Sequence, residues 1–123
     1  MIWDIIRNSS GPLTMALMLI AGISKVTGQT PMRDTAAHFG IPWERYRMIG
    51  FAELAAVVGI LIGFWVPVLG VVTGAAVVAL MIGAIVVHLR SSDPFTELGS
   101  AVVTWLFSTA YLVAQTVIMI RQF

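Results

Sequence analysis

Four long apolar stretches follow one another along the chain, and short polar segments separate them. They predict helices over about residues 10–26, 43–64, 67–89 and 97–120. A helix needs roughly 20 apolar residues to cross a bilayer, and only the first stretch falls slightly short of this length. Because lipid offers no hydrogen bonds to the backbone, helices are favoured over open strands. The pattern predicts an all-α integral membrane protein. Residues 1–123 should form a single domain of four transmembrane helices in an antiparallel up-down bundle.

The connections between these helices differ in length. Residues 27–46 contain the one long connection, in which residues 34–39 predict an amphipathic turn or two at the membrane interface. Residues 65–67 form a very tight turn, so the second and third helices should make a hairpin. Small residues recur every four positions on the second helix: Ala55, Gly59 and Gly63. This spacing predicts a close contact between the two helices of the hairpin.

Composition agrees with a membrane protein whose first partner is the lipid bilayer. Hydrophobic residues make up 59% of the chain and charged residues 11%, whereas about a quarter of a soluble domain is charged. The net charge is +1 and no cluster of Lys and Arg occurs, which argues against a nucleic-acid partner. The chain has no cysteine, which excludes disulfides, thiolate nucleophiles and Fe–S clusters held by the chain itself.

One charged residue interrupts the second apolar stretch. Glu53 lies six residues after Arg47, which is roughly 9 Å into the helix at the helical rise. A charge at that depth costs a few kcal/mol unless it faces protein, water or a cation. The up-down order brings Lys25, His88 and the Glu97 end of the last helix to the same end of the bundle. We therefore expect Lys25 or Arg90 to lie opposite Glu53, with His88 close by.

The last apolar stretch carries a polar stripe. Its residues step by four, four, three and four: Ser100, Thr104, Ser108, Tyr111 and Gln115. Such a stripe lies on one face of a helix, and a polar face is expected to point into the bundle rather than toward lipid. The stripe would thus extend the polar cluster around Glu53 toward the other membrane face.

Two interpretations of the cluster remain open. In one, Glu53 and Lys25 are a structural ion pair that fixes the register of two helices, and the stripe holds helices together. In the other, the cluster is a ligand pocket, since ionisable residues inside a membrane usually mark functional sites. A metal site is not predicted, because only His38 could join His88 as a second imidazole and no His/Glu motif accompanies it.

Short motifs along most of the chain resemble one protein family. They are Gly22…Lys25, Gly40-Ile41-Pro42, Gly50-Phe51-Ala52-Glu53-Leu54, Gly59…Gly63, and Met81…Gly83-Ala84…His88-Leu89-Arg90…Asp93. Over about residues 13–115 they resemble the DoxX-like membrane proteins. The resemblance implies a four-helix protein of the bacterial cytoplasmic membrane. Some relatives are subunits of a thiosulfate:quinone oxidoreductase, and others associate with membrane redox complexes. It also implies that Lys25, Glu53, His88 and Arg90 are the polar positions of the family.

The expected function follows from the pocket and the resemblance together. We expect an accessory or assembly subunit of a membrane redox complex, bound to a protein partner or to further copies of itself. The alternative is a stand-alone binder of a quinone or another lipid-soluble ligand at the Glu53 and His88 end. A small transporter is a third reading, but no inverted repeat or broken helix supports it. No intrinsic cofactor or catalytic motif is found, and thiosulfate chemistry does not carry over, so the sequence favours a non-enzymatic role.

The basic residues predict how the chain lies in the membrane. Five face the side of the longer connections: Lys25, Arg33, Arg45, Arg47 and Arg90. Only Arg7 and Arg121 lie on the side of the two termini. Since positive charge stays in the cytoplasm, the termini should lie outside it. A cysteine added after residue 123 should react with a membrane-impermeant maleimide in intact cells, and one placed in residues 27–46 should not. The opposite labelling pattern would reverse the orientation.

Overall fold

The computed structural model describes residues 1–122, and the side chains of all of these except Thr96 and Glu97. The five helices in this range are α1 (Ile2–Val26), α2 (Thr30–Phe39), α3 (Trp43–Gly63), α4 (Pro67–Arg90) and α5 (Phe95–Arg121). Within residues 1–122 no strand occurs, and α1, α3, α4 and α5 are long and apolar enough to cross a membrane. The prediction of an all-α protein with four membrane-spanning helices is confirmed.

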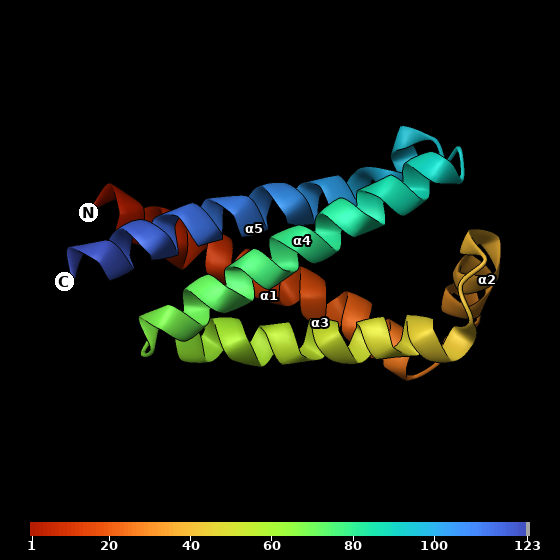
Figure 1. Cartoon of the computed structure of the whole chain (residues 1–123), viewed down its shortest axis with the longest axis horizontal. Helices are drawn as coiled ribbons and strands as arrows, with labels where there is room; N and C mark the ends of the chain where they lie inside the picture. The colour runs from red at the N-terminus through yellow and green to blue at the C-terminus, as the bar shows by residue number, and fades with distance from the viewer. Residues whose placement is uncertain (123) are drawn as a thin grey trace.

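The four long helices form a ring in which each helix contacts two others. α1 packs against α3 and α5, and α4 packs against the same two helices. The two termini lie together at one end of the bundle, and α2 lies at the opposite end (Figure 1). Successive long helices run in opposite directions, as the up-down prediction requires. α3 and α4 meet at their hairpin turn and separate toward the α2 end, so the bundle is closed at one end and open at the other (Figure 1).

α1 begins at Ile2, eight residues before the start predicted from the polar run at residues 8–10. That run does not cap the helix. Instead the Ser10 hydroxyl donates a hydrogen bond to the carbonyl of Ile6, one turn earlier in the same helix, at 2.6 Å. Pro12 lies inside the helix, a position that membrane helices tolerate better than soluble ones. The helix therefore continues through residues that would end it in water.

The closed end depends on glycines in the α3–α4 hairpin. A Cβ atom on Gly63 would lie 2.5 Å from the Cα atom of Gly70, so the two backbones are in contact there. One turn further along, a side chain on Gly59 would collide with the hydroxyl of Thr73. The predicted hairpin is thus present, but Ala55 is exposed because α3 and α4 have already separated at that level. The predicted three-residue contact is therefore reduced to its two glycines.

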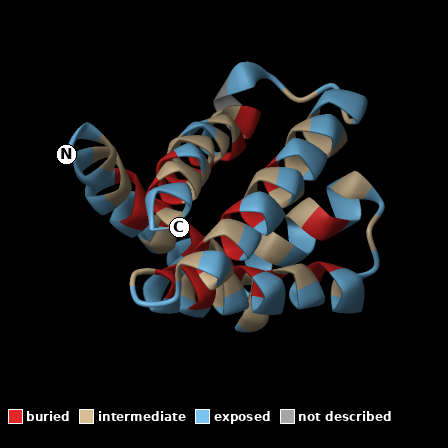
Figure 2. Ribbon diagram, turned by 60° about the vertical axis from the view of Figure 1, so that its left-hand side comes forward, coloured by how far each residue is buried: buried red, intermediate tan, exposed pale blue. Residues whose placement is uncertain are grey.

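Buried residues lie on the faces that the helices turn toward one another, and exposed residues lie on the outer faces (Figure 2). Many of the exposed residues are large and apolar. One cluster forms the core: Met18, Ile60, Val77, Met81 and Tyr111. Gln115 of α5 fastens this core to the hairpin, because its Nε2 atom donates to the carbonyl of Gly63 at 3.0 Å. An apolar outer surface of this kind is the surface that lipid covers.

We predict that Gly63→Ala destabilises the bundle, whereas Gly83→Ala does not. The new methyl group at position 63 would overlap the α4 backbone, and overpacking of this kind costs about 1–3 kcal/mol. At position 83 nothing lies within 4 Å, so the methyl group meets only lipid. Thermal unfolding of the two variants in one detergent is the measurement. Equal melting temperatures for the two variants would contradict the close contact at Gly63.

Candidate functional site

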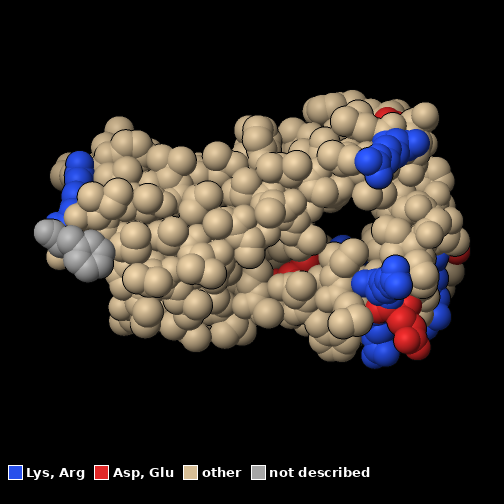
Figure 3. Space-filling view, in the orientation of Figure 1, with Lys and Arg blue, Asp and Glu red and all other residues tan. Residues whose placement is uncertain are grey.

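Charged side chains gather at the two ends of the molecule and leave a neutral band between them (Figure 3). The α2 end carries most of the charge. In the same view the surface is hollowed between α3 and α4, beside α2, and both acidic and basic surface is visible at this hollow (Figure 3). The open end of the bundle is therefore where polar groups lie next to an accessible space.

Lys25 of α1 and Glu53 of α3 form an ion pair at this end. The Nζ atom of Lys25 lies 2.8 Å from Oε1 of Glu53, and the two side chains are 13% and 3% exposed. Fold-back predicted Lys25 or Arg90 opposite Glu53, and the structure places Lys25 there. A carboxylate this far from water is stable in its charged form only beside a cation.

Two glycines bring the charged residues together. A Cβ atom on Gly22 would lie 2.8 Å from the side chain of Leu54, and one on Gly50 would lie 2.6 Å from the Cβ atom of Lys25. Only glycine therefore allows α1 and α3 to approach so closely. Each glycine precedes its charged residue by three positions, about one helical turn. The charged side chain therefore lies near the same face of its helix as the glycine, beside the point where the two helices cross.

The ion pair leaves hydrogen-bonding capacity unused. Oε1 of Glu53 is buried and faces the Lys25 ammonium at 2.8 Å, and no other hydrogen-bond donor among the described residues contacts it. The Lys25 ammonium also lies 5.3 Å from the centre of the Tyr46 ring, a cation–π distance. An ammonium group has three N–H donors, and this arrangement uses only some of them. A polar group of a ligand would find both donors and an acceptor here.

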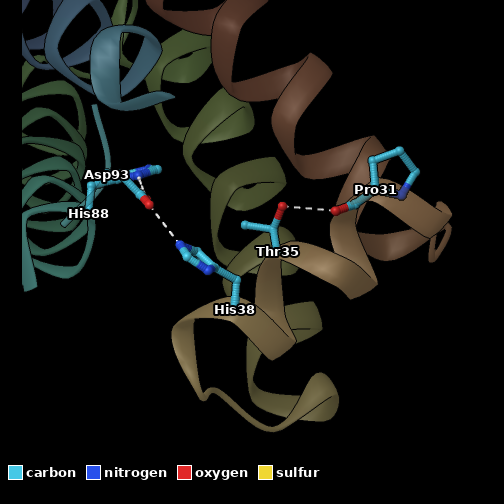
Figure 4. A network of polar contacts seen from close by, with 5 residues as sticks. All are labelled: Pro31, Thr35, His38, His88 and Asp93. Carbon is cyan, nitrogen blue, oxygen red and sulfur yellow. Dashed lines mark hydrogen bonds and ion pairs between the residues drawn. The ribbon is translucent and has the colours of Figure 1, made fainter. Parts of the chain in front are cut away.

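A second polar cluster lies between α2 and the α4–α5 connection. We call it the histidine–aspartate cluster; it consists of His38, Asp93 and His88 (Figure 4). Oδ1 of Asp93 is 2.7 Å from Nε2 of His38, and Oδ2 is 2.7 Å from Nδ1 of His88. Each ring nitrogen donates its proton to the carboxylate. These hydrogen bonds, first from His38 and then from His88, lower the pKa of Asp93 below its ordinary value.

The two clusters are separated by aromatic side chains. The Phe39 ring contacts His88 edge-on at 4.9 Å between centroids, and it lies 6.4 Å from the Tyr46 ring. Tyr46 in turn contacts Lys25. His88 is therefore bonded to Asp93 rather than to Glu53, and an aromatic layer joins it to the ion pair. Neither Phe39 nor Tyr46 was singled out from the sequence as part of the site.

The remaining predicted site residues divide into buried and exposed groups. Four residues of the polar stripe are buried on α5: Thr104, Ser108, Tyr111 and Gln115. Ser100 is exposed, because α5 there has passed the region where all four helices pack. Arg90 is also exposed and makes no ion pair with the described residues, so Lys25 is the partner of Glu53. Glu97 lies outside the described side chains.

Two of the four buried stripe residues bond to their own helix. Thr104 donates to the carbonyl of Ser100 at 2.8 Å, and Ser108 donates to that of Trp105 at 3.1 Å. The Tyr111 hydroxyl is buried without a hydrogen-bond partner among the described residues, and it lies close to Gly63 and Gly70 of the hairpin. The stripe is therefore mainly packing surface at the closed end, and the chemistry lies at the open end.

Asp93 is a site residue that sequence reasoning missed. It precedes Pro94, where an acid could cap α5, but its carboxylate makes no cap hydrogen bond and instead accepts from two imidazoles. The available signal was the presence of two histidines and one acid at the same end of the bundle. Within the described residues, no group of three or more His, Asp or Glu side chains is arranged to hold a metal ion.

Comparison with known proteins places the chain among membrane proteins of one kind. The family model described as the DoxX-like family matches residues 11–111. That match includes Lys25, Glu53, His88 and Asp93. Among curated proteins and among solved structures, nothing matches the chain.

We predict that Asp93 makes stability depend on pH in the acid range. Its pKa is lower in the folded protein than the ordinary value of about 3.9, so the unfolded chain binds the proton first. The stabilisation is present above that ordinary pKa and is lost as pH falls through the lower folded pKa. Asp93→Asn should lower the melting temperature at pH 7 and make it less dependent on pH between 7 and 3.

Asp34→Asn is the matched control, because Asp34 is an exposed acid on α2 that forms no ion pair with the described residues. It should keep the pH dependence of the wild type. An Asp93→Asn variant whose melting temperature follows the wild-type pH profile would contradict the role of the histidine–aspartate cluster.

Proposed function

The chain belongs to the DoxX-like family, and we propose that it is a membrane-embedded binding protein for a lipid-soluble ligand with a polar headgroup. A quinone in the bacterial cytoplasmic membrane is the candidate ligand. One observation carries the proposal: a buried carboxylate is paired with an ammonium whose remaining N–H donors are unused, and the pair lies at the open end of the bundle.

The chemistry of the ion pair fits a quinone headgroup. A quinone carbonyl accepts hydrogen bonds, and the Lys25 ammonium has N–H groups that the protein leaves free. The corresponding quinol hydroxyl donates, and the Glu53 carboxylate has lone pairs beyond the one that faces the Lys25 ammonium. The ring of such a ligand would find the aromatic side chains of Tyr46 and Phe39 nearby, and its apolar tail would remain in lipid.

A purely structural ion pair explains less of the arrangement. Two helices already held by glycine contacts and by a hydrogen bond do not need a buried charge pair to fix their register. That hydrogen bond runs from Nε of Arg47 to the carbonyl of Val26 at 3.0 Å, and it satisfies the end of α1. Replacing a buried ion pair with apolar residues is often neutral or stabilising. The presence of a buried ion pair at the open end of the bundle therefore supports a role in binding.

An accessory role in a membrane complex is the second candidate, and a different surface favours it. α4 and α5 form an open apolar groove of about 370 Å³ on the outside of the bundle, lined by Ile82, Ile85, Val86, Val102 and Trp105. A groove of this shape fits the ridge of a partner helix in the membrane. The two candidates are compatible, because the groove and the ion pair involve different side chains.

We predict that Glu53→Gln and Lys25→Met each destabilise the protein, by up to about 3–5 kcal/mol, because each leaves an uncompensated buried group. The double variant should recover much of this stability. It should nevertheless fail to retain a ligand, since both polar groups are gone. Melting temperatures in detergent, with native mass spectrometry of the membrane-extracted protein, measure both properties on the same samples.

His88→Leu is the comparison variant, because His88 lies across the aromatic layer and not in the ion pair. It should weaken ligand retention without the stability loss of the single ion-pair variants. Full ligand retention by the stable double variant would overturn the proposal. Copurification of a stoichiometric protein partner, without any small ligand in the wild type, would support the accessory role instead.

A further inference from the structure

α2 is attached to the rest of the bundle in an unusual way. Of its ten residues, Ala36 is the one whose side chain is buried. The helix is internally well formed, with the Thr35 hydroxyl donating to the Pro31 carbonyl at 2.8 Å (Figure 4). It is therefore a stable short helix with little buried surface to hold it in place.

Both ends of α2 are joined to the bundle through glycines in the left-handed conformation. Gly28 and Gly40 each have φ of +70°, a value that glycine adopts without strain and that other residues rarely adopt. A side chain at position 40 would meet nothing within 4 Å, so no packing fixes this turn. Gly28 is held more tightly, because Nε of Arg33 donates to its carbonyl at 3.1 Å. The two glycines are the joints on either side of one rigid helix, and Gly40 is the freer of the two.

Contacts at the C-terminal end of α2 reach across to α4 and the connection that follows it. His38 contacts Asp93, which also accepts from His88, and the Phe39 ring lies against the His88 ring. His38 is 53% exposed, whereas Asp93 is 10% exposed. Among the described side chains, only His38 of α2 and His88 of α4 act on the Asp93 carboxylate. These groups therefore hold α2 to the α4 side of the opening.

The position of α2 places it at one edge of the opening that leads to the ion pair. Phe39 lies between His88 of α4 and Tyr46 of α3, and Tyr46 contacts Lys25. The hollow between α3 and α4 lies beside α2 (Figure 3). A movement of α2 away from α4 would withdraw Phe39 and widen the opening between the two halves of the bundle.

We propose that α2 is a lid, hinged at Gly28 and Gly40, which the histidine–aspartate cluster holds closed over the Lys25–Glu53 ion pair. The identity of the ligand that passes the lid rests on the proposed function. The closing contact itself does not, because it is a property of this chain without any ligand. Breaking the contact at Asp93 or His38 should therefore open the lid and leave the four long helices in place.

A thiol-labelling experiment tests the lid without any ligand. The chain has no cysteine, so Tyr46→Cys introduces a single thiol beneath Phe39. In lipid nanodiscs its reaction with a water-soluble maleimide should be about tenfold faster when Asp93→Asn is added, the scale expected from losing hydrogen bonds to a charged group. His38→Leu should have the same effect. Amide hydrogen exchange should increase in α2 and remain unchanged in the long helices.

Asp34→Asn in the Tyr46→Cys background is the control, since it removes an acid from α2 that lies outside the cluster. Its labelling rate should match that of Tyr46→Cys alone. Labelling in the Asp93→Asn and His38→Leu variants that also stays at that rate would overturn the lid. A global rise in hydrogen exchange across α1 and α3 would also overturn it, because the cluster would then be a general stabilising contact.

A second measurement separates the lid from the proposed ligand. A short-chain benzoquinone is the probe, and its release from the wild type is compared with its release from Asp93→Asn. Faster release from the variant supports a lid over the site, and equal release overturns it. If the benzoquinone binds neither protein, the proposed function fails, and the thiol-labelling rates still decide whether α2 is held closed.

Discussion

A buried charge that must be neutralised within the membrane determines the arrangement of the open end. Glu53 lies in the middle of a membrane-spanning helix, where an isolated carboxylate is unstable. Lys25 can reach it only because Gly22 and Gly50 let α1 and α3 approach to backbone contact. The crossing of these two helices at Gly22 and Gly50 therefore places the two charges within reach of one another.

The two ends of the bundle differ in how tightly their helices pack. At the closed end glycine contacts in the α3–α4 hairpin and the Gln115 amide hold the helices together, and the buried hydroxyls bond mainly to their own helix. At the open end the helices separate, and polar side chains from α1, α2, α3 and the α4–α5 connection meet. Rigid packing at one end allows the other end to hold charged groups beside an opening, which is a usual condition for a binding site.

Much of this arrangement could be predicted from the sequence because lipid permits few alternatives. Apolar length fixes the number of crossings, short turns fix the order, and a charge within a span must find a partner near the same end. These grounds place Lys25 or Arg90 opposite Glu53 without choosing between them. They also do not fix the start of α1, since Ser10 is a capping residue in water and bonds back to its own helix here.

Asp93 shows the other limit of such reasoning. A local rule assigns an acid before a proline to a helix cap. In the structure the Asp93 carboxylate instead accepts a hydrogen bond from His38, 55 residues away. Ala55 and Ser100 were assigned to the interior by their spacing, but they are exposed because the helices diverge. The spacing of residues along one helix does not reveal the angle at which two helices cross. That angle determines the point along each helix beyond which the two no longer pack.

The ion pair can be measured directly, because Lys25 is the only lysine in the chain. Labelling lysine with ¹⁵N at Nζ gives one ammonium signal in solid-state NMR of the protein in lipid. With ¹³C at Cδ of glutamate, that signal should show strong dipolar dephasing, as the 2.8 Å contact between Nζ and Oε1 requires, and Glu53→Gln should abolish it. An ammonium signal without dephasing, or with dephasing that survives Glu53→Gln, would contradict the ion pair on which the open end depends.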